Sequence, residues 1–123
     1  MSASMSQDVV KSTQGAALID GIHTDVVCTN FSDRLFIVIT QYEKFGTLVN
    51  VTKDTVVEDG MREPTYSTSV LLGKDKPETH VIARNLASKI PVTKPILFAL
   101  ALKQTSPSVL HGLQELMVTH ACW

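Results

Sequence analysis

Residues 70–86, VLLGKDKPETHVIARNL, have the residue types of a phosphate-binding loop: a strand-like run, a glycine and a lysine, and then a helical segment. A phosphate cradle needs several glycines, a hydroxyl after the lysine for magnesium, and free N–H groups at the helix N-terminus. The segment has a single glycine, Gly73, and an aspartate follows Lys74. Pro77 removes one backbone N–H from the helix start. We therefore predict a structural turn in which Gly73 ends a strand and Pro77 begins a helix, and we expect no bound cofactor.

Cys28 is the candidate nucleophile, because a thiol beside a histidine and an acid could support covalent catalysis. It lies in the strand-like run VVCTNF, where a cysteine usually packs as a small core residue. His120 and Cys122, in the terminal HACW, are two candidate zinc ligands, whereas a structural zinc site usually has four. We interpret them as helix-end residues. The acidic residues of segment 53–65 are expected to be solvated rather than paired for acid–base catalysis. The sequence thus predicts no catalytic residue and no metal.

The length and composition of the chain indicate its domain count and exclude some classes of partner. With 123 residues, of which 44% are hydrophobic and 19% charged, the chain fits one compact domain. A net charge of -1 provides no basic surface for nucleic acid or anionic lipid. No apolar run approaches the roughly 18 residues of a membrane-spanning helix. We therefore expect no nucleic-acid partner and no membrane association.

The N-terminus and the cysteines indicate the compartment. The start, MSASMSQD, lacks the basic and apolar regions of a signal peptide. We expect residues 1–14 to be a loose tail and residues 15–123 to form the single domain. Cys28 and Cys122 are far apart in the sequence and do not make the framework of a secreted disulfide protein. We therefore predict a cytoplasmic protein with reduced thiols.

Two periodicities predict an α+β fold. A two-residue period typical of strands dominates the first half, and a helical period appears after Pro77. We expect a mainly antiparallel sheet of about six strands, or a sandwich, with two helices. The first strands should form a hairpin around Gly21. Strands within 35–42 and 45–51 should form the next pair, because sequential strands usually neighbour each other.

A charged segment interrupts the strand pattern in the middle of the chain. Residues 53–65, KDTVVEDGMREPT, contain Gly60 and Pro64 and are longer than an ordinary hairpin connection, which predicts a mobile loop. The remaining elements are expected in this order: a strand at 66–72, a helix at 77–90, a strand at 96–103 and a second helix from Pro107, capped by Ser106.

Two strands are apolar at every position, LFIVI at 35–39 and ILFALAL at 96–102. This indicates that both faces of the sheet are covered there. Two helices can cover one face. The other face needs a partner chain or a second layer made by the first hairpin, and a sandwich within the chain is the alternative. If a partner covers that face, the candidate interface residues are Phe36, Val38 and Val49.

Four segments, in the same order and spacing, resemble the proteasome assembly chaperone 3 family: TDVVCTNF, VITQYEKFGTLVNV, TSVLLGKDKPETHVIARNL and the terminal CW. The resemblance implies a non-enzymatic chaperone with a small, dimer-forming α+β domain and no catalytic residues. It implies pairing with the related proteasome assembly chaperone 4, and help to the proteasome α-subunits as they form the ring of the core particle, with release before maturation. Whether the isolated chain forms a homodimer stays open.

The charged segment is the candidate contact surface for the α-subunits, since it carries too many charges to bury. The candidate residues are Lys53, Asp54, Glu58, Asp59, Arg62 and Glu63. A solvated linker is the alternative for this segment. For the whole chain, a small dimeric scaffold for signalling or trafficking complexes would also have a partner and no active site. A third hypothesis, a thiol enzyme without a cofactor, would depend on Cys28.

Overall fold

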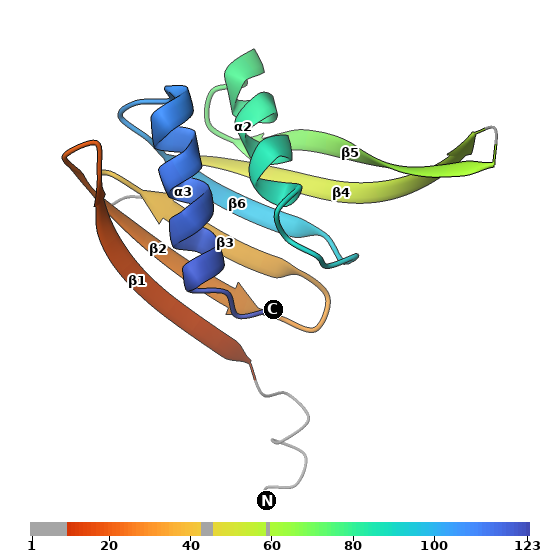
Figure 1. The fold of residues 1–123 in the computed structure, drawn as a ribbon, viewed down its shortest axis with the longest axis horizontal. Coiled ribbons are helices and arrows are strands. Elements are labelled where there is room, and N and C mark those ends of the chain that lie inside the picture. The colour runs from red at the N-terminus through yellow and green to blue at the C-terminus, as the bar shows by residue number, and fades with distance from the viewer. Residues whose placement is uncertain (1–9, 43–45, 59) are drawn as a thin grey trace, which may run out of the picture.

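Six strands and two helices make up the part of the chain that the computed structural model describes, residues 10–42, 46–58 and 60–123. Side chains are described in these ranges except at 55–58 and 61–64. The strands are β1 (Lys11–Ile19), β2 (Ile22–Asn30), β3 (Leu35–Thr40), β4 (Thr47–Glu58), β5 (Met61–Leu72) and β6 (Ile96–Ala101). The helices are α2 (Pro77–Ala87) and α3 (Pro107–Thr119). Both helices lie on one face of a single sheet (Figure 1), so the predicted α+β class is confirmed.

The strand order is β1-β2-β3-β6-β4-β5, and all neighbours are antiparallel except β3 and β6, which run parallel. The predicted hairpin around Gly21 is confirmed as β1–β2. The predicted pairing of β3 with β4 is wrong, because β6 lies between them: Ile96 pairs with Leu35 on one side and with Val51 on the other. The reason is burial. β6 is apolar at every position, and a central place covers both of its edges with other strands.

β4 and β5 form a long hairpin where the sequence predicts a mobile loop. Each strand has 12 residues, and the pairing runs from Leu48 with Leu72 to Glu58 with Met61. The loop prediction is wrong because two strands can pair through their backbone groups without an apolar alternation of their side chains. The hairpin projects beyond the helices, away from the body of the domain (Figure 1). We call residues 53–65 the hairpin arm.

The core lies between the sheet and the two helices. In β3, the side chains of Leu35, Ile37 and Ile39 face the helices and are no more than 1% exposed. The same layer contains buried side chains from the other elements, among them Val26, Cys28, Val49, Val51, Ile82, Leu86, Ile96, Phe98, Leu100, Val109, Leu113, Leu116 and Met117. Full burial of one large aliphatic or aromatic side chain contributes about 1.5–3 kcal/mol. This layer is therefore the main source of the stability of the domain.

The helix starts match the predicted ones. The Ser106 hydroxyl accepts a hydrogen bond from the Val109 N–H at 3.4 Å, as an N-cap should, and a proline opens α3. α2 ends at Ala87 rather than at Ile90 as predicted, but a last turn, with the Ile90 N–H bonded to the Ala87 carbonyl, still buries Ile90. Within the described ranges, neither helix is long and apolar enough to cross a membrane.

The turn between β5 and α2 is structural, as the sequence predicts. Gly73 has a φ of 100°, a backbone conformation that strains residues with a side chain. A Cβ at this position would also lie 2.8 Å from Thr47 Oγ1, closer than ordinary contact. Pro77 is the first residue of α2. Gly73 and Pro77 therefore shape the connection between strand and helix.

The second face of the sheet has no covering layer within the described residues. The β1–β2 hairpin continues the sheet beside β3 and does not fold over it (Figure 1). The sandwich, and the second layer made by the first hairpin, are therefore wrong for this chain. The described part of the chain therefore places no layer above the apolar side chains of this face, which are shielded only by their neighbours in the sheet.

Candidate interaction surfaces

The open face, as we call the face of the sheet opposite α2 and α3, has an apolar centre. Strand side chains alternate between the two faces, so residues next to core positions point to the open face. The register places Val38 between Val27 and Ala99, and places Leu48 beside Ala99. Phe36 lies beside Leu97 in the next row. The apolar centre of the open face thus consists of Val27, Phe36, Val38, Leu48, Leu97 and Ala99.

The surroundings of this centre are polar. Side chains at the rim belong to small or uncharged residues for the most part: Ser12, Gln14, Asp25, Thr29, Asn50, Thr52, Ser67 and Ser69. At the end of β5, Leu71 and Leu72 are 59% and 63% exposed. An uncharged apolar centre inside a polar rim is the composition of a protein–protein interface.

The structure separates the three predicted interface residues. Phe36 and Val38 lie on the open face and are half-buried. Val49 lies on the opposite face, where it is 0% exposed and pairs with Phe98 in the core layer. Placing Val49 with the other two is therefore corrected: it is a core residue of this chain. Its neighbour Leu48 lies on the open face instead. The pairing of β4 with β6 determines which of these two side chains points to the open face.

The hairpin arm also separates two of the predicted contact residues. Lys53 lies on the helix side, where its Nζ donates to the Ile90 carbonyl and lies 5.8 Å from the centroid of the Tyr66 ring. Burial lowers the pKa of Lys53. Asp54 is exposed on the other side of the arm, where its carboxylate accepts a hydrogen bond from the Ser67 hydroxyl at 3.4 Å. Lys53 is thus engaged within its own chain, whereas Asp54 faces solvent.

The structure describes the remaining predicted contact residues only in part. Asp59 lies outside the described residues. Glu58 ends β4, and Arg62 and Glu63 lie in β5, but their side chains are outside the described ones. The backbone register pairs Glu58 with Met61 and so brings these charged positions to one end of the hairpin.

His80 links a hydroxyl to a carboxylate, an arrangement with no signal in the sequence. Its Nδ1 lies 2.6 Å from Thr68 Oγ1, and its Nε2 lies 2.5 Å from Asp75 Oδ1. These residue types occur in acyl-transfer triads. The Thr68 hydroxyl, however, also accepts a hydrogen bond from Arg84 at 3.4 Å and belongs to a paired strand. We interpret these hydrogen bonds as structural, because they hold α2 and the preceding turn against β5.

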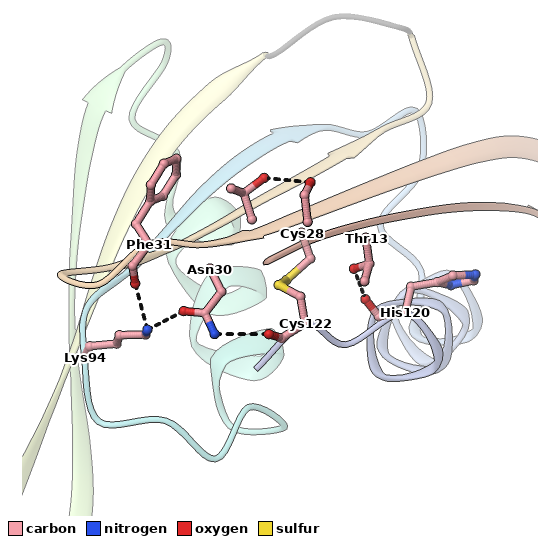
Figure 2. Close-up of a disulfide and its surroundings, with 9 residues drawn as sticks. Thr13, Cys28, Asn30, Phe31, Lys94, His120 and Cys122 are labelled. Atoms are coloured by element: carbon pink, nitrogen blue, oxygen red, sulfur yellow. Dashed lines mark hydrogen bonds between the residues drawn. A yellow bond between two sulfur atoms is a disulfide. The ribbon is translucent and has the colours of Figure 1, made fainter. Parts of the chain in front are cut away.

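Cys28 and Cys122 form a disulfide, with Cα atoms 6.0 Å apart across a sequence separation of 94 residues (Figure 2). The prediction of reduced thiols is therefore wrong, because α3 packs on β1 and β2 and returns the end of the chain to β2. The described residues contain no free cysteine, which contradicts the thiol-enzyme hypothesis for Cys28. They also contain no group of three or more His, Cys, Asp or Glu residues that could hold a metal ion.

Comparison with known proteins identifies the family. The family model described as proteasome assembly chaperone 3 matches residues 37–119. Proteasome assembly chaperone 3 of Nematostella vectensis is 40% identical over 119 residues, covering 89% of this chain and 88% of the relative. The Bos taurus protein of that name is 38% identical over 118 residues, covering 94% of this chain and 96% of the relative. The Homo sapiens protein is 36% identical over the same shares of both chains.

The fold is similar to a chain in the crystal structure of a novel chaperone complex for yeast 20S proteasome assembly. The match has a TM-score of 0.61 and 12% sequence identity, and covers 87% of this chain and 94% of that chain. At this identity the likeness concerns the fold alone. The family model and the relatives carry the assignment: the chain belongs to the proteasome assembly chaperone 3 family, a family of non-enzymatic chaperones.

Proposed function

We propose that this chain acts in the cytoplasm as one subunit of a dimeric chaperone, which promotes formation of the α-ring of the proteasome core particle and leaves before the particle matures. The observation that supports a dimer is the open face, an apolar sheet surface on which no described helix or strand packs. Large apolar patches are rare on monomeric soluble proteins and usually mark a binding site. Family membership supports the proteasome as the place of action.

A second sheet of the same kind is the partner that best fits the open face. Two sheets pack face to face about 10 Å apart, and their side chains interdigitate. The strands at the centre, β3 and β6, carry no charged residue, so covering them removes no charge from water. We propose that proteasome assembly chaperone 4 supplies this sheet. A homodimer through the same face is the alternative for the isolated chain.

The tip of the hairpin arm is the part that we propose contacts the α-subunits. The arm projects away from the helices (Figure 1), so it would stay accessible when a partner covers the centre of the sheet. The sequence of the tip places Glu58, Asp59 and Glu63 near a single Arg62. Such a charged contact would mainly raise the association rate with a basic surface.

Affinity purification tests the proposed function against the scaffold alternative. The tagged wild-type chain should recover proteasome α-subunits together with a second small chaperone. Tagged Val38→Glu serves as the matched control, because it should lose the second chaperone while remaining folded. Recovery of signalling or trafficking proteins without α-subunits would contradict the proposal and favour a small dimeric scaffold.

A further inference from the structure

The disulfide joins Cys122 to Cys28, which lies near the C-terminal end of β2. We call residues 120–123 the C-terminal segment; it follows α3 and crosses the helix side of β2 (Figure 2). Cys28 is 1% exposed and belongs to the core layer, and Cys122 is 5% exposed. The bond therefore connects the last residues of the chain directly to the core.

Noncovalent contacts hold the C-terminal segment in the same place. The Thr13 hydroxyl donates to the His120 carbonyl, and the Asn30 side-chain N–H donates to the Cys122 carbonyl at 3.0 Å (Figure 2). The His120 ring fills the space over Gly15, where a Cβ would collide with it. These contacts involve atoms other than the two sulfurs, so they hold the C-terminal segment against β1 and β2 in addition to the disulfide.

Asn30 extends these contacts to two loops. Its Oδ1 accepts a hydrogen bond from Lys94 Nζ, and the same ammonium group donates to the Phe31 carbonyl at 2.8 Å (Figure 2). Phe31 follows β2, and Lys94 precedes β6. Forming or breaking the disulfide should therefore change the local stability of the sheet where β2 ends and β6 begins.

We propose that Cys28 and Cys122 form a reversible latch, which oxidation closes and reduction opens. This inference rests on the proposed function for the cytoplasmic location of the chain, and disulfides in a reducing cytosol are usually transient or redox-sensing. Two thiols held close by their surroundings have a high effective concentration for each other, which favours closure within the chain over cross-linking between chains. The latch lies on the helix side of the sheet, so the proposal does not depend on the partner of the open face.

Closure requires a disulfide oxidant, for which we name oxidised glutathione. The Cys122 thiolate attacks one sulfur of oxidised glutathione, which forms a mixed disulfide and releases one glutathione thiolate. The Cys28 thiolate then attacks the Cys122 sulfur, which forms the Cys28–Cys122 bond and releases the second glutathione thiolate. The two cysteine thiols lose two electrons and two protons, and the oxidant becomes two thiols. Two molecules of reduced glutathione reverse the reaction. Cys122 reacts first because it lies outside the helices and strands and opens more readily than Cys28, which belongs to the paired strand β2.

Trp123 reports the state of the latch. It is the only tryptophan of the chain, it directly follows Cys122, and it packs half-buried against the core. In the closed state its motion is limited by the adjacent disulfide. In the open state the last residues can fray, which increases the access of solvent to the indole ring.

The test equilibrates the full chain in buffers of different reduced-to-oxidised glutathione ratios. One aliquot of each sample is quenched with acid and alkylated in denaturant, and intact mass and non-reducing peptide mapping then give the fraction with the Cys28–Cys122 bond. Melting temperature and acrylamide quenching of Trp123 are measured on a second aliquot that is not alkylated. The oxidised chain should melt at least about 5 °C higher, because the bond restricts a long loop of the unfolded chain. Its Trp123 should also be quenched less.

Cys122→Ser is the matched control. It keeps the backbone carbonyl that Asn30 bonds, and its melting and quenching should match those of the reduced wild type at every ratio. The comparison of oxidised with reduced wild type needs no substitution, so a poorly folding variant would not remove the test. Three results would overturn the proposal: folded wild type with two alkylated thiols at all ratios, a bond that persists at the most reducing ratio, or a closed bond without any change in melting and quenching.

Discussion

The two faces of β3 carry the same kinds of side chain in different surroundings. On the helix side, Leu35, Ile37 and Ile39 are no more than 1% exposed beneath the helices. On the open face, Phe36 and Val38 are half-buried, with neighbouring strands beside them and no layer above. Residue type alone therefore does not distinguish a contact for folding from a contact for association. The difference arises from which face the chain itself covers.

Substitutions at adjacent residues should separate the two faces by their effect on stability. Ile37→Ala should lower the free energy of unfolding by about 2–5 kcal/mol, because it leaves a cavity in a closed layer. Val38→Ala should cost about 1 kcal/mol or less in the monomer, since little apolar area leaves its partly covered site. Urea unfolding at a concentration that keeps the chain monomeric measures both. Equal losses would contradict the assignment of the two faces.

The hairpin arm should affect binding kinetics and leave folding unchanged. Replacing Glu58, Asp59 and Glu63 with Ser should leave the melting temperature unchanged, because a segment this rich in charge is expected to contribute no side chains to the core. Association with isolated α-subunits should slow about threefold to tenfold at low salt and become less salt-sensitive. Stopped-flow measurements across a salt series test this. Glu115→Ser, which removes an exposed charge from α3, is the control. If the association rate at low salt equals that of wild type, the proposal that the arm contacts the α-subunits is contradicted.

The smallest expected effect is the pH dependence contributed by Lys53. Burial lowers its pKa in the folded chain below the ordinary 10.5. Between the folded pKa and 10.5 the unfolded chain holds more protons, so the contribution of Lys53 to stability rises with pH in this window. Below the folded pKa the contribution is a constant penalty. The unfolding free energy of wild type minus that of Lys53→Met should therefore increase towards pH 10.5. A flat or falling difference would contradict the burial of this ammonium group, and Lys74→Met provides an exposed-lysine control.

Local signals in the sequence predicted the elements well. Gly21 marks the turn of the first hairpin, and Ser106 with the following proline marks the start of α3, because caps and turns depend on a few adjacent residues. The two-residue and helical periods likewise give six strands and two helices. Apolar residues at every position of β3 also pointed correctly to a face that the helices do not cover.

Properties that depend on distant residues were not predictable in the same way. The sequences of β3 and β4 do not indicate that β6 lies between them. Without this strand order, the sequence does not show whether Val49 or Leu48 points to the open face. The proximity of Cys28 and Cys122 follows from the path of α3 across β1 and β2. The hairpin arm was missed because its strands pair through the backbone, and residues 53–65 carry no apolar alternation to detect.

The most direct test of the interface is sedimentation velocity with proteasome assembly chaperone 4, using wild type, Val38→Glu and Gln14→Glu. Gln14 lies on the polar rim of the open face and provides a control for added charge. Wild type and Gln14→Glu should form the heterodimer with affinities within about threefold of each other. Val38→Glu should remain folded by circular dichroism and bind at least about 100-fold more weakly, because an unpaired charge would be buried at the centre. A folded Val38→Glu chain that forms the dimer with wild-type affinity would contradict the assignment of the open face as the dimer interface.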